Sequence, residues 1–285
     1  MSLNRTKLFV SCHHEVTVPN NTLLVPIQVG AALTDKRFPG FLYDNTGDNI
    51  SHLNRSYCEL TAQYWAWKNA DLDYYGFFHY RRYLYPGVRV SNPYRVEYCA
   101  TSSVLQKLHY DRFESLIALY DIILPIGEDM HMSVYDHYSL GKHQHQEDLE
   151  LVWTIVAERY PEYANAMREY FSGTICYFGN IFIMKRPLFF EYCEWLFSIL
   201  AEFDRRSHTE HYSPQEKRVD GYLAERLLGV YITYQKSVNP LQIAELPRVH
   251  FTFNMREYLM KNFCNLLLPP GTKRRSVVKS LSRRR

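Results

Sequence analysis

The fold is decided by YYGFFHYRRYLY, residues 74–85, where an apolar strand runs directly into cationic and aromatic side chains. Residues 73–78 predict a buried strand, and His79-Tyr80-Arg81-Arg82-Tyr83 follows it without a spacer. In open α/β sheets, the carboxyl ends of strands carry functional groups beside a ligand crevice. The stretch therefore predicts an α/β fold with a ligand site at the end of this strand.

Strands and helices alternate on both sides of this stretch. Apolar runs predict further strands at residues 7–12, 23–29, 120–125 and 175–184. Helical periodicity predicts helices at residues 51–69, 147–159, 161–171, 187–203 and from Asp220 onward. Such alternation is typical of a largely parallel sheet flanked by helices. We divide the chain into a catalytic domain over 1–240, a C-terminal helical extension over 241–271 and a basic tail over 272–285.

Charge is distributed unevenly along the 285 residues. The tail carries Lys273, Arg274, Arg275, Lys279, Arg283, Arg284 and Arg285, and it has no acidic residue. Removing those seven from the 33 basic residues leaves 26 against 30 acidic residues, so the remaining chain is acidic. Such a tail can bind an anionic membrane surface, or it can be a solvated end without function. An acidic body argues against a nucleic-acid-binding module.

Several classes of protein are disfavoured by what the sequence lacks. It contains no GxGxxG, GxxxxGK[ST], GxSxG or HExxH motif, which argues against dehydrogenases, P-loop enzymes, serine hydrolases and zincins. Six scattered cysteines without a CxxC pair favour reduced thiols in a cytoplasmic chain. No apolar run is long enough for a transmembrane helix, and the N-terminus does not resemble a signal peptide.

Charged side chains in four places are candidates for chemistry. Arg81 and Arg82 can bind a diphosphate bidentately, or they can pair with acids of the body. Asp44, Asp48 and Asn49 in the loop 37–51 can contact a base, ribose or sugar, or can form the turn itself. Asp220 can serve as a general base at the start of a helix, or it can cap that helix.

The fourth place is HQHQED, residues 143–148, which combines two histidines with two carboxylates. His143 and His145 could bind a metal or act on the acceptor side, although the spacing fits no standard zinc motif. Glu147 and Asp148 could instead belong to the first turn of a helix, where acids complement the helix dipole.

Several blocks together resemble a known bacterial family. They are PIQVGAAL, YDNTGDNISHLNRSYCELTAQYWAWKN, YYGFFHYRRYLY, DIILP, the HxHQEDL element, GNIFIM and GYLAERLL, in this order over residues 7–235. The family occurs in capsular and exopolysaccharide gene clusters and was long catalogued as a domain of unknown function. Its members are regarded as glycosyltransferases of the GT-A type and are linked to UDP-galactofuranose as donor.

The resemblance implies roles for particular residues. A GT-A fold, which is Rossmann-related, places the nucleotide over the first strands, here at Cys12, His13 and Gly30. The usual DxD metal motif is replaced by His79-Tyr80-Arg81-Arg82, so we expect no divalent metal and no other cofactor. The arginines would neutralise the leaving diphosphate. Gly179 and Asn180 would lie near the donor sugar. Asp220 would be the base, with Asp148 and Glu147 as the next candidates.

The resemblance also implies a function. We expect an inverting, metal-independent transfer of a sugar, galactofuranose first, from a UDP-sugar to a growing lipid-linked saccharide in capsule or O-antigen synthesis. The enzyme would be cytoplasmic and held to the inner face of the plasma membrane by its basic tail. Two alternatives remain open, which are a metal-dependent UDP-hexose transferase using His143 and His145, and a carbohydrate-binding or assembly subunit without catalysis.

Overall fold

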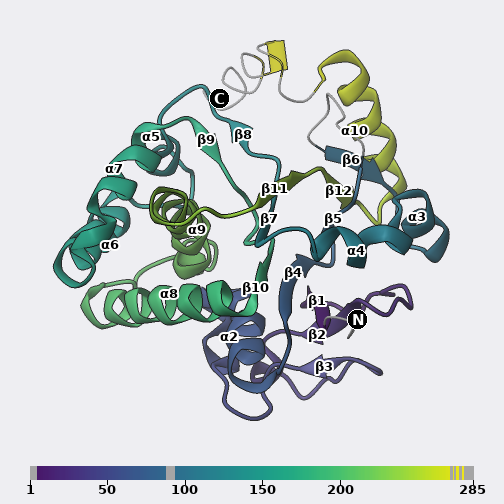
Figure 1. Cartoon of the computed structure of the whole chain (residues 1–285), viewed down its shortest axis with the longest axis horizontal. Coiled ribbons are helices and arrows are strands. Elements are labelled where there is room, and N and C mark those ends of the chain that lie inside the picture. The colour runs from purple at the N-terminus through teal and green to yellow at the C-terminus, as the bar shows by residue number, and fades with distance from the viewer. Residues whose placement is uncertain (1–4, 88–93, 270–271, 273, 276–277, 279–285) are drawn as a thin grey trace.

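A central sheet of ten strands organises the described part of the chain, which comprises residues 5–87, 94–269, 272, 274, 275 and 278 of the computed structural model (Figure 1). Its main path runs β11-β7-β10-β4-β1-β2-β3, and β5, β6 and β12 extend it from β4. These strands are β1 (Thr6–Cys12), β2 (Leu24–Gln28), β3 (Leu42–Tyr43), β4 (Tyr74–His79), β5 (Arg82–Leu84), β6 (Tyr94–Glu97), β7 (Ile122–Pro125), β10 (Phe182–Lys185), β11 (Ile243–Leu246) and β12 (Arg248–Phe251). The short strands β8 (Glu128–Asp129) and β9 (Ile175–Cys176) form a separate pair.

The directions of the strands place the carboxyl ends of β1 and β4, where the sequence predicts a ligand site, at one edge of this sheet. β1 is parallel to β2 and β4, β2 is parallel to β3, and β7 is parallel to β11. β10 is antiparallel to both β4 and β7. The amino end of β10 therefore lies at the same edge as the carboxyl ends of β1 and β4. The prediction of a mostly parallel sheet flanked by helices is confirmed.

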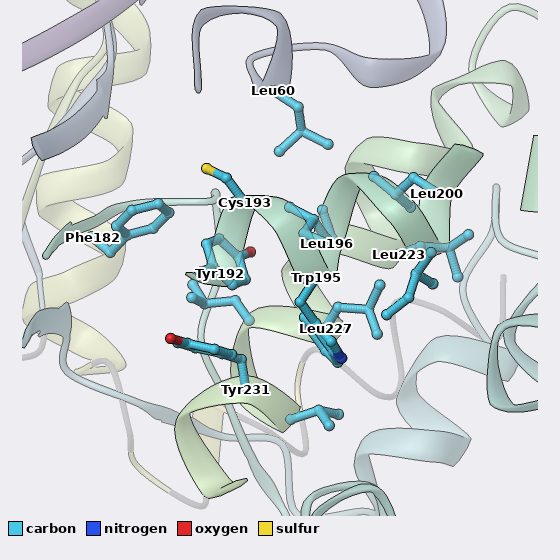
Figure 2. Close-up of a cluster of buried hydrophobic side chains, with 14 of the residues drawn as sticks. Leu60, Phe182, Tyr192, Cys193, Trp195, Leu196, Leu200, Leu223, Leu227 and Tyr231 are labelled. Carbon is cyan, nitrogen blue, oxygen red and sulfur yellow. The ribbon is translucent and has the colours of Figure 1, made fainter. Parts of the chain in front are cut away.

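Helices cover both faces of the sheet. They are α1 (Asn54–Tyr57), α2 (Leu60–Asn69), α3 (Ser102–Lys107), α4 (Phe113–Ile117), α5 (Val134–Ser139), α6 (Gln146–Arg159), α7 (Ala164–Ser172), α8 (Arg186–Arg206), α9 (Val219–Val238) and α10 (Met255–Leu267). The larger apolar core lies between the sheet and α2 and α5 to α9, and Figure 2 shows the part where α8 packs on α9. The smaller core lies under α3 and α4.

Side-chain alternation along the strands fills both cores. In β1, Phe9 faces the larger core, whereas Leu8 and Val10 face the smaller one. In β4, Phe77 and Phe78 divide in the same way. Neighbouring residues of a strand point to opposite faces, which explains why these strands read as continuous apolar runs in the sequence.

Two predicted elements are interrupted by left-handed backbone. The predicted helix 51–69 breaks at Cys58, where φ is 51°, because the Asn54 side chain binds the Cys58 carbonyl oxygen at 2.6 Å and closes α1. The predicted strand 175–184 breaks at Gly179 and Asn180, where φ is 91° and 49°. The two halves of that strand then pair with different partners, β9 with β8 and β10 with β4 and β7. Both breaks lie beside the candidate site.

The sheet extends further along the chain than the predicted boundary at residue 240. β11 pairs with β7, and β12 pairs with β5 and β6, so residues 243–251 lie in the central sheet. Of the predicted extension 241–271, only the part beyond β12 lies outside the sheet, and within it α10 is the described helix. Most of the basic tail 272–285 falls outside the described residues.

Candidate active site

The candidate site begins at the tight turn between β4 and β5. His79 ends β4 and pairs with Arg82 of β5, so Tyr80 and Arg81 alone form the turn. The Arg81 backbone N–H donates to His79 Nδ1 at 3.2 Å, and the Arg81 carbonyl accepts from Phe251 N–H of β12 at 2.8 Å. The turn is therefore fixed on two sides, and both arginine side chains leave the sheet at its functional edge.

Aromatic rings join this turn to the carboxyl end of β1. The ring of His13, which follows β1 directly, lies 5.8 Å from the ring of His79 and 5.0 Å from that of Tyr80. The Arg81 guanidinium lies 5.3 Å from the Tyr80 ring centroid. The structure thus brings together His13, His79, Arg81 and Arg82, four residues that the sequence analysis assigned to one binding site.

Positive charge dominates this cluster. Burial, reinforced by Arg82, lowers the pKa of His79 to about 2, and burial with the charges of His14 and Arg218 lowers the pKa of His13 to about 4. Both rings are therefore neutral near pH 7, because burial disfavours their charged form and the nearby cations add to this effect. Among the described residues, no carboxylate forms an ion pair with Arg81 or Arg82.

A buried donor in the cluster also has no partner. Arg81 Nε is shielded from solvent and makes no hydrogen bond with any residue that the structure describes. Buried polar groups are nearly always paired, so such an atom is a candidate for contact with a ligand. Unpaired guanidinium groups in a partly buried position suit an anion with several oxygens, such as a diphosphate.

The loop before β10 completes the site from the other side. The Gly179 N–H donates to Glu225 Oε1 at 2.6 Å, and Asn180 Nδ2 donates to Glu59 Oε1 at 3.0 Å. An added Cβ at Gly179 would lie 3.4 Å from an Arg82 guanidinium nitrogen, and its φ of 91° disfavours any other residue. The left-handed turn therefore lets the loop lie directly against Arg82.

Two pockets flank the cluster. One, of about 880 Å³, extends from His13 and His14 between the segment after β1 and the loop at Phe38–Phe41. The other, of about 430 Å³, includes Arg82 and is bordered by these further residues: Glu128, Met130, His137, Phe178, Glu225, Arg248, Val249, His250, Lys261 and Arg275. His13 borders the larger pocket and Arg82 the smaller one, and the His79 ring lies 5.8 Å from that of His13.

Glu225 is a site residue that the sequence analysis did not select. Its side chain is 17% exposed, borders the smaller pocket together with Arg82, and has its pKa raised by burial. It lies one helical turn after Gly221 on α9, between the buried residues Ala224 and Arg226. An acid inside an otherwise buried helical stretch was the signal that could have identified it.

Asp220, the first candidate for a base, is fully buried. Ser56 donates its hydroxyl to one carboxylate oxygen, and burial together with Asp204 raises the pKa well above its usual value. Asp220 is in the first turn of α9, and the residue at the N-cap is Arg218. Asp220 borders neither pocket. Its hydrogen bond with Ser56 links α9 to α1.

The cluster 143–148 lies at the start of α6, away from both pockets. Glu147 and Asp148 are in its first turn and His145 is its N-cap, as the dipole interpretation predicted. The His145 ring stacks on Tyr212 at 4.3 Å, and Tyr212 donates its hydroxyl to Asp148 at 3.0 Å. His143 remains a candidate on the acceptor side. Among the described residues, no group of three or more His, Cys, Asp or Glu side chains is arranged to hold a metal ion.

The loop 37–51 is held together by a buried carboxylate, Asp44. It accepts hydrogen bonds from the Gly30 and Ala31 N–H groups at 2.7 and 2.9 Å, and from the hydroxyls of Ser51 and Thr61. These contacts fix the turn after β2, where Gly30 faces Asn54. Cys12, at the end of β1, is buried beneath the cluster.

Asp48 and Asn49 bind within the same loop and to α2. Asn69, the last residue of α2, accepts from Asp48 N–H at 3.1 Å, and Tyr64 donates its hydroxyl to the Asp48 carboxylate. The Asn49 side chain donates to the Gly47 carbonyl at 2.9 Å. Neither residue borders the two pockets. The contacts match the turn-forming interpretation, and a role in donor binding stays a prediction.

Replacing Asp44 by alanine should lower the free energy of unfolding by about 3 kcal/mol, because two buried backbone N–H groups and two hydroxyls lose their acceptor. Asp48→Ala, at an exposed position of the same loop, should change it by less than about 0.5 kcal/mol. Urea unfolding of both variants measures the difference. Equal losses for the two would show that Asp44 does not hold the loop.

The strand order, the antiparallel β10 and the site at the carboxyl edge define a GT-A-like fold. A solved apo structure of the bifunctional glycosyltransferase WbbM is similar to it, with a TM-score of 0.82 and 34% sequence identity. The match covers 87% of this chain and 46% of that one, so the chain spans about half the length of WbbM.

The chain belongs to the family described as a domain of unknown function, DUF4422, whose model matches residues 7–236. A search of curated proteins found no match. Among the described residues, no helix is both long enough and apolar enough to cross a bilayer.

Proposed function

We propose that this protein is a glycosyltransferase that binds a nucleoside diphosphate sugar across the β4–β5 turn. The observation that carries the proposal is the cationic pair Arg81 and Arg82, for which the described residues supply no ion-pair partner, at the carboxyl edge of a GT-A-like sheet. The similarity to WbbM, a bifunctional glycosyltransferase, supports the same activity. Within this proposal, the diphosphate lies against the two arginines and the nucleoside occupies the pocket beside His13.

The identity of the donor and of the acceptor is proposed from the family resemblance. We propose a UDP-sugar as donor, with galactofuranose as the first sugar to test, and a growing saccharide of a bacterial surface polysaccharide as acceptor. The pocket bordered by Glu225 and His250 would receive that acceptor. Burial with the charges of Lys261 and Arg82 lowers the pKa of His250 to about 4, so its neutral ring can hydrogen-bond sugar hydroxyls.

The side chains at the β4–β5 turn do not fit a divalent cation. A metal that bridges the diphosphate would need carboxylates there. The turn instead carries His79, Arg81 and Arg82, and burial together with the arginine charges lowers the pKa of His79. We therefore derive no step through a metal. The guanidinium groups would offset the negative charge that develops on the leaving diphosphate.

For the base we propose Glu225 in place of Asp220, because its carboxylate borders the same pocket as Arg82. Glu225 would take the proton of the acceptor hydroxyl as the acceptor oxygen forms a bond to the anomeric carbon. The bond from that carbon to the diphosphate oxygen would break, and UDP would leave against Arg81 and Arg82. This single displacement inverts the anomeric configuration.

Release of UDP from a panel of UDP-sugars, measured with and without EDTA, tests the proposal. We expect slow hydrolysis of one donor, faster release when saccharide acceptor is added, and rates unchanged by EDTA. Rates abolished by EDTA and restored by Mn²⁺ would contradict the role of the arginines. A chain that binds UDP-sugars but releases no UDP with any donor or acceptor would be a binding subunit.

A further inference from the structure

Helix α10 presents an apolar face to solvent. Six large apolar side chains of this helix are between 52% and 77% exposed: Met255, Leu259, Met260, Phe263, Leu266 and Leu267. At 3.6 residues per turn they share one side of the helix, and no residue of α10 is buried. We call these six side chains the α10 apolar face.

The opposite face of α10 is polar and packs on the body of the protein. Lys261 donates to His250 Nε2 of β12 at 3.1 Å, and Asn265 accepts from Arg275 at 2.6 Å. Figure 1 shows α10 beside β6 at the rim of the molecule, away from the helices that build the larger core. A surface helix of a globular protein normally buries its apolar side and exposes its polar side. In α10 this arrangement is reversed.

The sequence after α10 indicates what covers this face. Residues 272–285 carry seven basic residues and no acid, while the rest of the chain is net acidic. An exposed apolar helix face followed directly by a polybasic segment is the combination that binds the headgroup region of an anionic membrane. A second copy of this chain would present the same basic segment and would be repelled by it.

We propose that the α10 apolar face docks on an anionic lipid bilayer, with the helix lying in the plane of the interface and the positive charge of the sequence that follows it attracting it to lipid headgroups. The apolar side chains would enter the acyl boundary, and the basic residues would be attracted to the negative surface. The helix would lie on the membrane without spanning it.

This docking would place the acceptor pocket at the membrane surface. Lys261, on the inner face of α10, borders the pocket that also contains Arg82 and Glu225. If the proposed function holds, an acceptor saccharide attached to a lipid could then reach Glu225 while its lipid stays in the bilayer. The docking itself does not depend on catalysis.

The test is co-sedimentation of the full chain with vesicles of phosphatidylglycerol and phosphatidylethanolamine, without any sugar donor. We expect the wild type to bind and the triple variant Leu259→Gln/Phe263→Gln/Leu266→Gln to bind about 100-fold more weakly. The three side chains are exposed, so the variant should fold. The matched control is Leu119→Gln/Leu140→Gln, which removes two exposed leucines outside α10 and should bind like the wild type.

Three results would overturn the proposal. One is undiminished vesicle binding by the triple variant, and another is a similar loss in the Leu119/Leu140 control. The third is wild-type protein that ignores vesicles and sediments as a dimer that the triple variant dissociates, because the face would then be an interface between copies. Unchanged release of UDP in solution by the triple variant would separate loss of docking from loss of the proposed activity.

Discussion

The variant Glu225→Gln should transfer sugar about 1,000-fold more slowly than the wild type, with donor affinity nearly unchanged. Glutamine can still accept the Gly179 N–H bond, so the loop beside Arg82 should keep its position. It cannot take a proton from the acceptor. Steady-state kinetics with a saturating donor and a UDP titration by calorimetry would measure the two effects separately.

The pH dependence of the rate gives an independent readout of Glu225. A base works in its deprotonated form, so kcat should rise with pH through the Glu225 pKa. This rise in kcat should occur at a higher pH than for an ordinary glutamate, because burial raises the pKa of Glu225. In Glu225→Gln this rise of kcat with pH should disappear.

The matched control for Glu225 is Asp220→Asn. Its amide can still accept from the Ser56 hydroxyl inside the protein, so kcat should stay within about tenfold of the wild type. An active Glu225→Gln together with an inactive, folded Asp220→Asn would restore Asp220 as the base.

Arg82→Ala should weaken UDP binding about 100-fold and lower kcat further, because in the proposed function the guanidinium would contact both the ground-state diphosphate and its developing charge. Arg82→Lys should recover part of the affinity, since it keeps the charge and loses the bidentate geometry. Arg205→Ala, on the exposed surface of α8, is the control and should bind UDP like the wild type. Calorimetric titration in EDTA measures all three. Wild-type affinity in Arg82→Ala would place the diphosphate elsewhere.

Much of the fold could be predicted because the sheet is buried on both faces. β1, β2, β4 and β7 read as apolar runs, and the histidine and arginines after β4 marked the functional edge before any geometry was known. The grouping of His13 with His79, Arg81 and Arg82 came from the family resemblance, and the parallel pairing of β1 with β4 explains why the structure brings them together.

Most features of the fold and the site that the sequence did not predict depend on tertiary contacts that no local pattern encodes. The break at Gly179 accompanies the pairing of β9 with the distant strand β8. The break at Cys58 rests on a local bond, from the Asn54 side chain to the Cys58 carbonyl, that helical periodicity does not reveal. Asp220 matched a motif order, yet its burial is set by packing of α1 against α9. Glu225 enters the site only because the loop before β10 reaches α9. The predicted helical extension over 241–271 gave neither the bounds of α10 nor the side of that helix that faces solvent.

The central claim is that Arg81 and Arg82 recognise a diphosphate, and calorimetric titration of the wild-type chain with UDP, UMP and uridine in EDTA tests it most directly. UDP should bind at least about tenfold more tightly than UMP, and UMP more tightly than uridine, with affinities that fall as salt is raised. Equal affinity for UDP and UMP, or UDP binding that requires an added divalent cation, would contradict the claim.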